Sequence, residues 1–93
     1  MSVVIVGGHD RMVCRYQKIC RNYRCKAKIF TQMSANMDKQ IGTPDLFILF
    51  TNTVSHKMVK PAVDEAKRKK IHVVRSHTSS GAALESILRE YSA

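Results

Sequence analysis

Residues 46–50 have the sequence LFILF, the longest apolar run of the chain. Successive side chains of a strand point to opposite faces, so an unbroken apolar run needs cover on both faces. Such a strand is typical of the centre of a parallel sheet with helices above and below it. This stretch therefore predicts an α/β fold built on parallel strands.

Shorter apolar runs on either side complete the sheet. We expect strands at about 2–6, 26–30 and 71–74, each bounded by glycine or polar residues. In the second of these, Lys26 and Lys28 alternate with Ala27 and Ile29. That alternation favours an edge strand, because lysine discourages pairing with other chains. Together with residues 46–50, the sheet is predicted to have four strands.

Helical patterns follow each predicted strand. Asp10 is expected to cap the first helix, and a short second helix would start at Ser34 and end near Gly42. Ser55 would cap a third helix that Pro61 distorts in its first turns, and the last helix would cover about 80–91. Strand and helix thus alternate along the whole chain.

The 93 residues fit one domain, 1–93, with a ligand-binding role. We expect a small doubly wound α/β domain with a four-stranded parallel sheet, similar to flavodoxin-like or Rossmann-like folds. Right-handed crossovers bring the carboxyl ends of all parallel strands to one edge. Ligands of such folds bind at that edge, where the strand order reverses.

Three of the four histidines follow predicted strands. His9, His56 and His77 each come a few residues after a strand end, whereas His72 lies inside the last strand. The fold therefore predicts that the first three share the ligand-binding edge, where they are candidate metal ligands. His72 is expected to be packed or to face the sheet edge.

Other polar and glycine residues are predicted at the same edge. Arg75 and Lys57 are candidate partners for a carboxylate or a phosphate, although Arg75 would equally suit a salt bridge with Asp10. Free amide groups at helix starts also favour anions. The hydroxyls have a simpler role as helix caps, worth about 1 kcal/mol each. The complete candidate ligand set is Gly7, Gly8, His9, Asn52, Ser55, His56, Lys57, Arg75, Ser76, His77, Ser79 and Ser80.

The composition limits the class of protein. The formal net charge is +9, which favours anionic partners such as phosphate groups, nucleic acid or a carboxylate-bearing cofactor. No apolar run is long enough to cross a membrane and no signal peptide is evident, so we expect a cytoplasmic protein without membrane contact. The three cysteines match no metal or redox spacing, and we expect Cys14 and Cys20 to pack as small apolar residues.

Several activities are disfavoured by missing motifs. One carboxylate at the edge is too few for a response-regulator receiver, and Walker and GxGxxG phosphate loops are absent. The chain also lacks the aromatic residues and the length of a flavin site. No GxSxG nucleophile motif is present. Binding without catalysis is therefore the favoured class of function.

Three kinds of ligand fit the edge. Histidines could hold haem through its iron, with Arg75, Lys57 or a helix start receiving the propionates. The same groups could bind phosphate or nucleic acid without a metal, the latter through Arg11, Arg15 and Lys18. A zinc-type enzyme centre with three histidines is the weakest alternative.

Three segments resemble a known bacterial family. VVIVGGHDRM (3–12), LFTNTVSHKMV (49–59) and VVRSHTSSGAAL (73–84) are similar to the family called domain of unknown function 2325, and the resemblance extends over the whole chain. Membership implies a compact α/β protein with a basic edge that carries histidines. The signature positions fall on Gly7, Gly8, His9, Asn52, Ser55, His56, Arg75, Ser76 and His77.

The sequence therefore predicts a non-catalytic binding or sensor protein. An anionic cofactor would bind at the carboxyl edge of the sheet, with haem as the leading candidate. Because a chain of this size has a thin core and a surplus of methionine and tyrosine, we also expect a homodimer.

Overall fold

The computed structural model describes residues 1–32 and 40–91, apart from the side chain of Met58. The short helix predicted to start at Ser34 lies outside the described residues. All other predicted helices and strands are within them.

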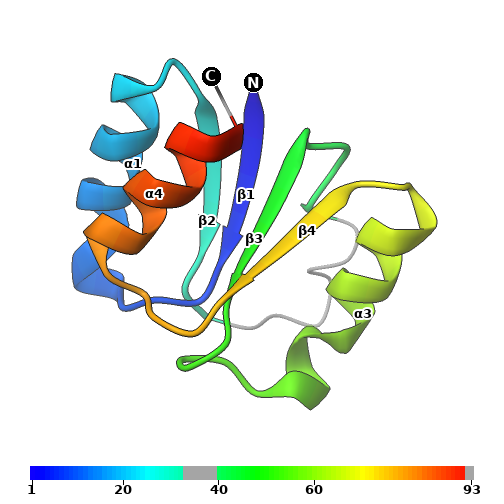
Figure 1. The fold of residues 1–93 in the computed structure, drawn as a ribbon. Helices are drawn as coiled ribbons and strands as arrows, with labels where there is room; N and C mark the ends of the chain where they lie inside the picture. The colour runs from blue at the N-terminus through cyan, green and yellow to red at the C-terminus, as the bar shows by residue number, and fades with distance from the viewer. Residues whose placement is uncertain (33–39, 92–93) are drawn as a thin grey trace.

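Four parallel strands form one sheet, as the sequence predicted. They are β1 (Ser2–Val6), β2 (Lys26–Phe30), β3 (Leu46–Phe50) and β4 (His72–Ser76). Their order across the sheet is β2-β1-β3-β4, so β1 and β3 are central and β2 is an edge strand (Figure 1). In register, Val3 lies opposite Leu46, and Leu46 lies opposite His72.

Helices cover both faces of the sheet. A short 3-10 turn, η1 (Asp10–Met12), leads into α1 (Val13–Asn22), which lies with α4 (Gly81–Tyr91) on one face (Figure 1). Helix α3 (His56–Arg68) covers the other face. This arrangement is the doubly wound fold that the apolar run 46–50 predicted, and every residue of β3 is buried.

Each face has its own apolar core. Ile5 and Ile48 of the sheet pack with Tyr16 of α1 and Leu84 of α4. On the opposite face, residues such as Phe47 pack with α3. Alternate side chains of each strand thus pack against the helices of opposite faces, and the sheet is held between two helix layers.

Two helices end in the same way. The amide of Cys25 donates to the carbonyl of Cys20 at 2.8 Å, with Arg24 in the left-handed conformation at φ 58°. The amide of Ile71 likewise donates to Ala66 at 2.8 Å after Lys70, whose φ is 60°. Both ends are Schellman motifs, in which glycine normally occupies the left-handed position.

Several local predictions were wrong. Asp10 does not cap the first helix: it is the first residue of η1, whose N-cap is His9. The last strand lies slightly later than predicted, at 72–76. Helix α3 continues through Pro61, which is exposed there. Cys14 is exposed and not packed, whereas Cys20 is buried as expected.

The predicted homodimer is not supported by the methionine and tyrosine side chains that the structure describes. Tyr16 is fully buried, and Met12 and Tyr23 pack against the core. Among the described residues, the large apolar side chains that are exposed are Met1 and Tyr91. Tyr16, Met12 and Tyr23 therefore serve the core of one chain, whereas Met1 and Tyr91 do not, and the dimer stays a prediction.

Candidate functional site

The carboxyl ends of all four strands meet at one edge of the sheet. From β1 the chain crosses to β2 on one side, and from β2 it returns past β1 to β3. The direction of winding therefore reverses between β1 and β3, which is where ligands of open parallel sheets bind. The loops that follow β1 and β3 are the walls of this switch point.

Gly7 and Gly8 let these two loops approach closely. Their φ angles are +108° and +85°, a region that disfavours side chains. A β-carbon on Gly7 would lie 2.7 Å from the hydroxyl of Thr53, and one on Gly8 would lie 2.6 Å from the hydroxyl of Tyr16. Both glycines are thus required by backbone conformation and by space.

The amides of both glycines are already used inside the protein. Gly7 donates to the carbonyl of Phe30 at 2.8 Å, and Gly8 donates to Oγ1 of Thr53 at 2.7 Å. The amides of Gly7 and Gly8 are therefore not free donors, and the two glycines shape the loop; their place in a ligand site stays a prediction. Thr53, which is not in the candidate ligand set, is the residue that joins the two loops.

The three predicted histidines do follow their strands at this edge. His9 precedes η1, His56 is the first residue of α3, and His77 comes directly after β4. All three are exposed. No group of three or more His, Cys, Asp or Glu side chains in the described part of the chain is arranged to hold a metal ion. The edge is shared, but it does not include a preassembled three-histidine centre.

The fourth histidine lies away from this edge. His72 begins β4 and is exposed, with its ring 5.0 Å from that of Tyr91, centroid to centroid. It contacts the last turn of α4 beside the sheet, consistent with the packed or edge-facing position predicted for it.

Asp10 and Arg75 do not form the salt bridge that the sequence left open. The carboxylate of Asp10 accepts hydrogen bonds from Thr31 Oγ1 and, at 3.3 Å, from Gln32 Nε2. Arg75 is the penultimate residue of β4, is exposed, and lies on the α3 face because Val73, two residues earlier, packs there. The carboxylate of Asp10 is thus occupied by Thr31 and Gln32, and it does not balance the positive charge of Arg75.

The start of α3 is the most unusual electrostatic feature of the edge. Ser55 occupies the N-cap position with extended backbone angles, but its side chain makes no capping hydrogen bond. The first turn carries His56 and Lys57 and no acidic residue. The ammonium group of Lys57 is unfavourable at the positive end of a helix dipole. An anion would relieve this local excess of positive charge.

The predicted hydroxyl groups have unequal roles. Ser80 caps α4, because its Oγ accepts the amide of Ala83 at 3.1 Å. Ser76 Oγ donates to the carbonyl of Thr78 at 2.8 Å, so it stabilises the turn after β4. The carbonyl of Ser79 accepts a hydrogen bond from the hydroxyl of Tyr16. Burial raises the pKa of Tyr16, and the side chain of Ser79 has a smaller, opposite effect. Asn52 is exposed in the loop after β3.

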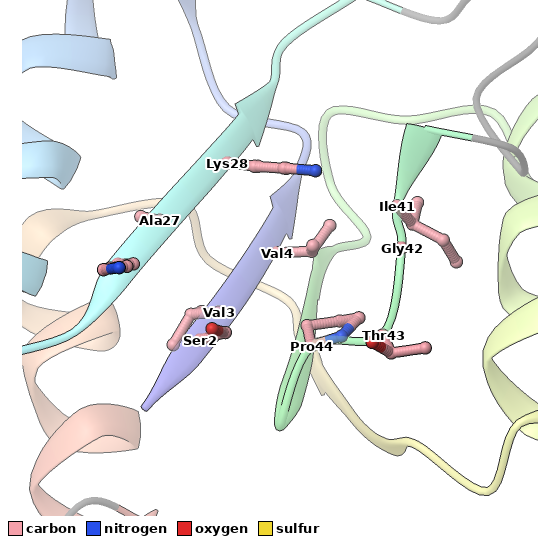
Figure 2. Close-up of a pocket in the computed structure, with 10 residues that line it drawn as sticks. Ser2, Val3, Val4, Ala27, Lys28, Ile41, Gly42, Thr43 and Pro44 are labelled. Carbon is pink, nitrogen blue, oxygen red and sulfur yellow. The ribbon is translucent and has the colours of Figure 1, made fainter.

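A separate pocket of about 260 Å³ lies near the opposite end of the sheet (Figure 2). The chain from Ile41 to Pro44 forms one wall, and β1 and β2 form the other. Lys28 lies at this pocket and donates to the carbonyl of Gln40 at 3.4 Å. The pocket could not be predicted from the sequence, because no local pattern indicates that 41–44 lies against β1 and β2.

The fold and the edge define a Rossmann-like α/β protein with a basic switch point. The chain belongs to the family described as "Uncharacterized protein conserved in bacteria (DUF2325)", whose model matches residues 2–91. The resemblance drawn from the three sequence segments is therefore confirmed.

Two solved structures are similar to this chain in fold. A de novo designed Rossmann fold protein superposes with a TM-score of 0.65 at 16% identity, over 97% of this chain and 95% of the other. A de novo designed Rossmann 2x2 fold protein, solved by NMR in solution, has a TM-score of 0.64 at 12% identity, over 99% and 87%. At these identities the likeness concerns the fold alone. Comparison with curated proteins gives no match.

The structure bears on the predicted lack of membrane contact and does not test the predicted location in the cell. Within residues 1–32 and 40–91, no helix has the length and apolar character needed to cross a membrane. The cytoplasmic location stays a prediction.

Proposed function

We propose that this protein binds a small anionic ligand, without catalysis, at the switch point between β1 and β3. The ligand would lie between the loop that carries His9 and the start of α3. His56 and Lys57 would be the main partners of its negative charge, with Arg75 and His77 as further candidates from the β4 side.

One observation carries this proposal. Helix α3 begins at the switch point with no side-chain cap, with His56 and Lys57 in its first turn and with no acidic residue there. Free amides and the helix dipole favour an anion at such a position. Helix α4 differs, because the side chain of Ser80 caps its first turn. The uncapped, positively charged first turn of α3 does not stabilise the helix, which supports a role in binding.

Haem is the specific anionic ligand that we propose to test first. Its iron needs an imidazole, and its propionates need positive partners. His9, His56 and His77 are exposed at the edge, and Lys57 and Arg75 are exposed as well. A phosphorylated small molecule is the alternative, and it would use the same helix start without an iron ligand.

Absorption spectroscopy with added haem separates these ligands. Coordination is expected to give a sharp Soret band that one of His9→Ala, His56→Ala and His77→Ala shifts or abolishes. His72→Ala is the matched control, because this histidine lies at the other end of β4 and contacts Tyr91. A spectrum of free haem only, or an equal effect of His72→Ala, would exclude haem as the ligand.

NMR titration with pyrophosphate tests the anion site itself. We expect chemical-shift changes at the amides of residues 55–59, and we expect Lys57→Ala to weaken binding several-fold. Changes spread evenly over the surface, or none at the start of α3, would refute the anion site whatever the result with haem.

A further inference from the structure

The outward surface of α1 is strongly basic over its whole length. No acidic residue occurs between Asp10 and Asp38. We define the α1–β2 basic surface as the exposed cations that lie on η1, α1, the turn that follows and the start of β2: Arg11, Arg15, Lys18, Arg21, Arg24 and Lys26.

These cations gather on one side because of helical periodicity. Tyr16, Ile19 and Cys20 form the buried stripe of α1, so positions such as Lys18 and Arg21 face outward. Residues Arg11 to Arg21 cover about 15 Å along the helix axis. The surface is therefore a band and not a single point of charge.

Tertiary structure extends the band from α1 to the edge strand. Arg21 and Gln17 of α1 line the same shallow, open groove as Lys26 of β2. At the other side, a β-carbon built on Gly81 would meet the guanidinium of Arg15, so Arg15 lies over the start of α4. The cations thus span the width of α1 from α4 to β2.

Internal ion pairs do not neutralise this band. In the part of the chain that the structure describes, the salt bridges join Glu65 with Arg68 and with Lys69, all on or beside α3. A row of unneutralised cations about 15 Å long matches the phosphate backbone of duplex nucleic acid, which carries about one charge per 1.7 Å of axis.

We propose that the α1–β2 basic surface binds the phosphate backbone of double-stranded nucleic acid without sequence specificity. Single-strand binders stack bases on exposed aromatic rings, but Tyr16 of α1 is fully buried and Tyr23, in the turn that follows, packs against the core. Membrane-surface helices insert exposed apolar side chains, whereas the apolar stripe of α1 lies in the core. The proposal is independent of the anion site at α3.

Fluorescence anisotropy with a labelled duplex of about 20 base pairs, at about 50 to 200 mM salt, tests this surface. The logarithm of the affinity is expected to fall with the logarithm of salt at a slope of about −5 for six phosphate contacts. Lys18→Gln/Arg21→Gln is expected to reduce the slope by about 2 and the affinity at the lowest salt by about tenfold.

Lys60→Gln/Lys67→Gln is the matched control, because it removes the same charge from exposed positions of α3 on the other face of the sheet. The control is expected to bind the duplex within about twofold of the wild type. An equal loss of duplex affinity in the α1 variant and in the α3 control would mean that only the net charge matters, and it would overturn the proposal. The same holds if no binding occurs at the lowest salt, or if phosphatidylserine vesicles or polyglutamate bind more tightly than the duplex.

Two further results separate this proposal from the anion site. Lys57→Ala is expected to leave duplex binding unchanged, and Lys18→Gln/Arg21→Gln is expected to leave pyrophosphate binding at α3 unchanged. Loss of duplex binding in Lys57→Ala would contradict a separate surface on α1 and β2.

Discussion

The hydroxyl of Thr53 lies 2.7 Å from the amide nitrogen of Gly8, whose hydrogen bond it accepts, although 45 residues separate the two in sequence. The same hydroxyl donates to the carbonyl of Phe50 at 3.1 Å. One side chain thus joins the loops after β1 and β3 across the switch point. The shape of the candidate site depends on this link.

Removal of the link should destabilise the protein. Thr53→Val keeps the shape of the side chain but leaves the half-buried amide of Gly8 without its acceptor, which is expected to cost about 1–3 kcal/mol. Thr53→Ser keeps the oxygen and is the control. Urea unfolding gives the free energy of unfolding of each variant. Equal stability of Thr53→Val and Thr53→Ser would show that the hydrogen bond contributes little.

Alanine at the switch-point glycines should be far more costly than alanine at another glycine of positive φ. Gly7→Ala and Gly8→Ala combine a strained backbone with contacts under 3 Å, so a loss of more than about 3 kcal/mol is expected. Gly42 has φ +65°, but a β-carbon there would meet Lys28 Nζ at an ordinary contact distance of 3.8 Å, and Gly42→Ala should cost only about 1 kcal/mol. Similar losses at all three sites in urea unfolding would contradict the role of close packing.

Glycine should stabilise the chain at two helix ends. Arg24 and Lys70 adopt φ angles of 58° and 60°, where a side chain costs about 1 kcal/mol. Arg24→Gly and Lys70→Gly are each expected to raise the free energy of unfolding by about that amount. Arg24→Ala and Lys70→Ala remove the same charges but keep the strain. If the alanine variants were as stable as the glycine variants, charge and not backbone conformation would explain the gain.

Ser80 and Ser55 should differ although both precede helices. Ser80 Oγ accepts the amide of Ala83, so Ser80→Ala is expected to cost about 1 kcal/mol. Ser55 makes no such bond, and Ser55→Ala should change stability by less than about 0.5 kcal/mol. Thermal unfolding of the two variants decides this, and a loss at Ser55 as large as that at Ser80 would show that α3 is capped in solution.

Stability should fall at alkaline pH through a buried thiol. Burial, with a smaller contribution from Cys25, raises the pKa of Cys20 from 9.0 to about 11. Because of the raised pKa, the Cys20 thiol stays protonated up to a higher pH in the folded state than in the unfolded chain. This contribution to stability is therefore full below pH 9 and is lost as the pH rises towards 11, with a slope of up to about 1.4 kcal/mol per pH unit.

Urea unfolding between pH 8 and 11 measures that slope. Cys20→Ala should make it shallower, whatever its effect on stability at neutral pH, while Cys14→Ala, at the exposed cysteine of the same helix, should leave it unchanged. Burial also raises the pKa of Tyr16 and of Cys25, so some slope remains in every variant. An unchanged slope in Cys20→Ala would contradict the role of this thiol.

Local sequence patterns were enough to predict the elements of the fold. The run 46–50 became the fully buried central strand β3, and the alternation of Lys26 and Lys28 marked β2 as an edge strand. Apolar periodicity is a local property, and parallel strands connected by helices bring their carboxyl ends to one edge. The order of the residues along the chain therefore placed His9, His56 and His77 at that edge.

The partners of individual side chains depended on tertiary structure. Strand order is set by which strands bury each other. In the observed order β1 lies between β2 and β3, which brings Thr53 against Gly8 and Asp10 beside Thr31. For the same reason, Asp10 was not a helix cap, and Arg21 came to share a groove with Lys26. Sequence by itself determined the elements and their direction, because these follow from local apolar patterns. The contacts between loops were decided by packing of residues far apart in the chain, which leaves no local pattern.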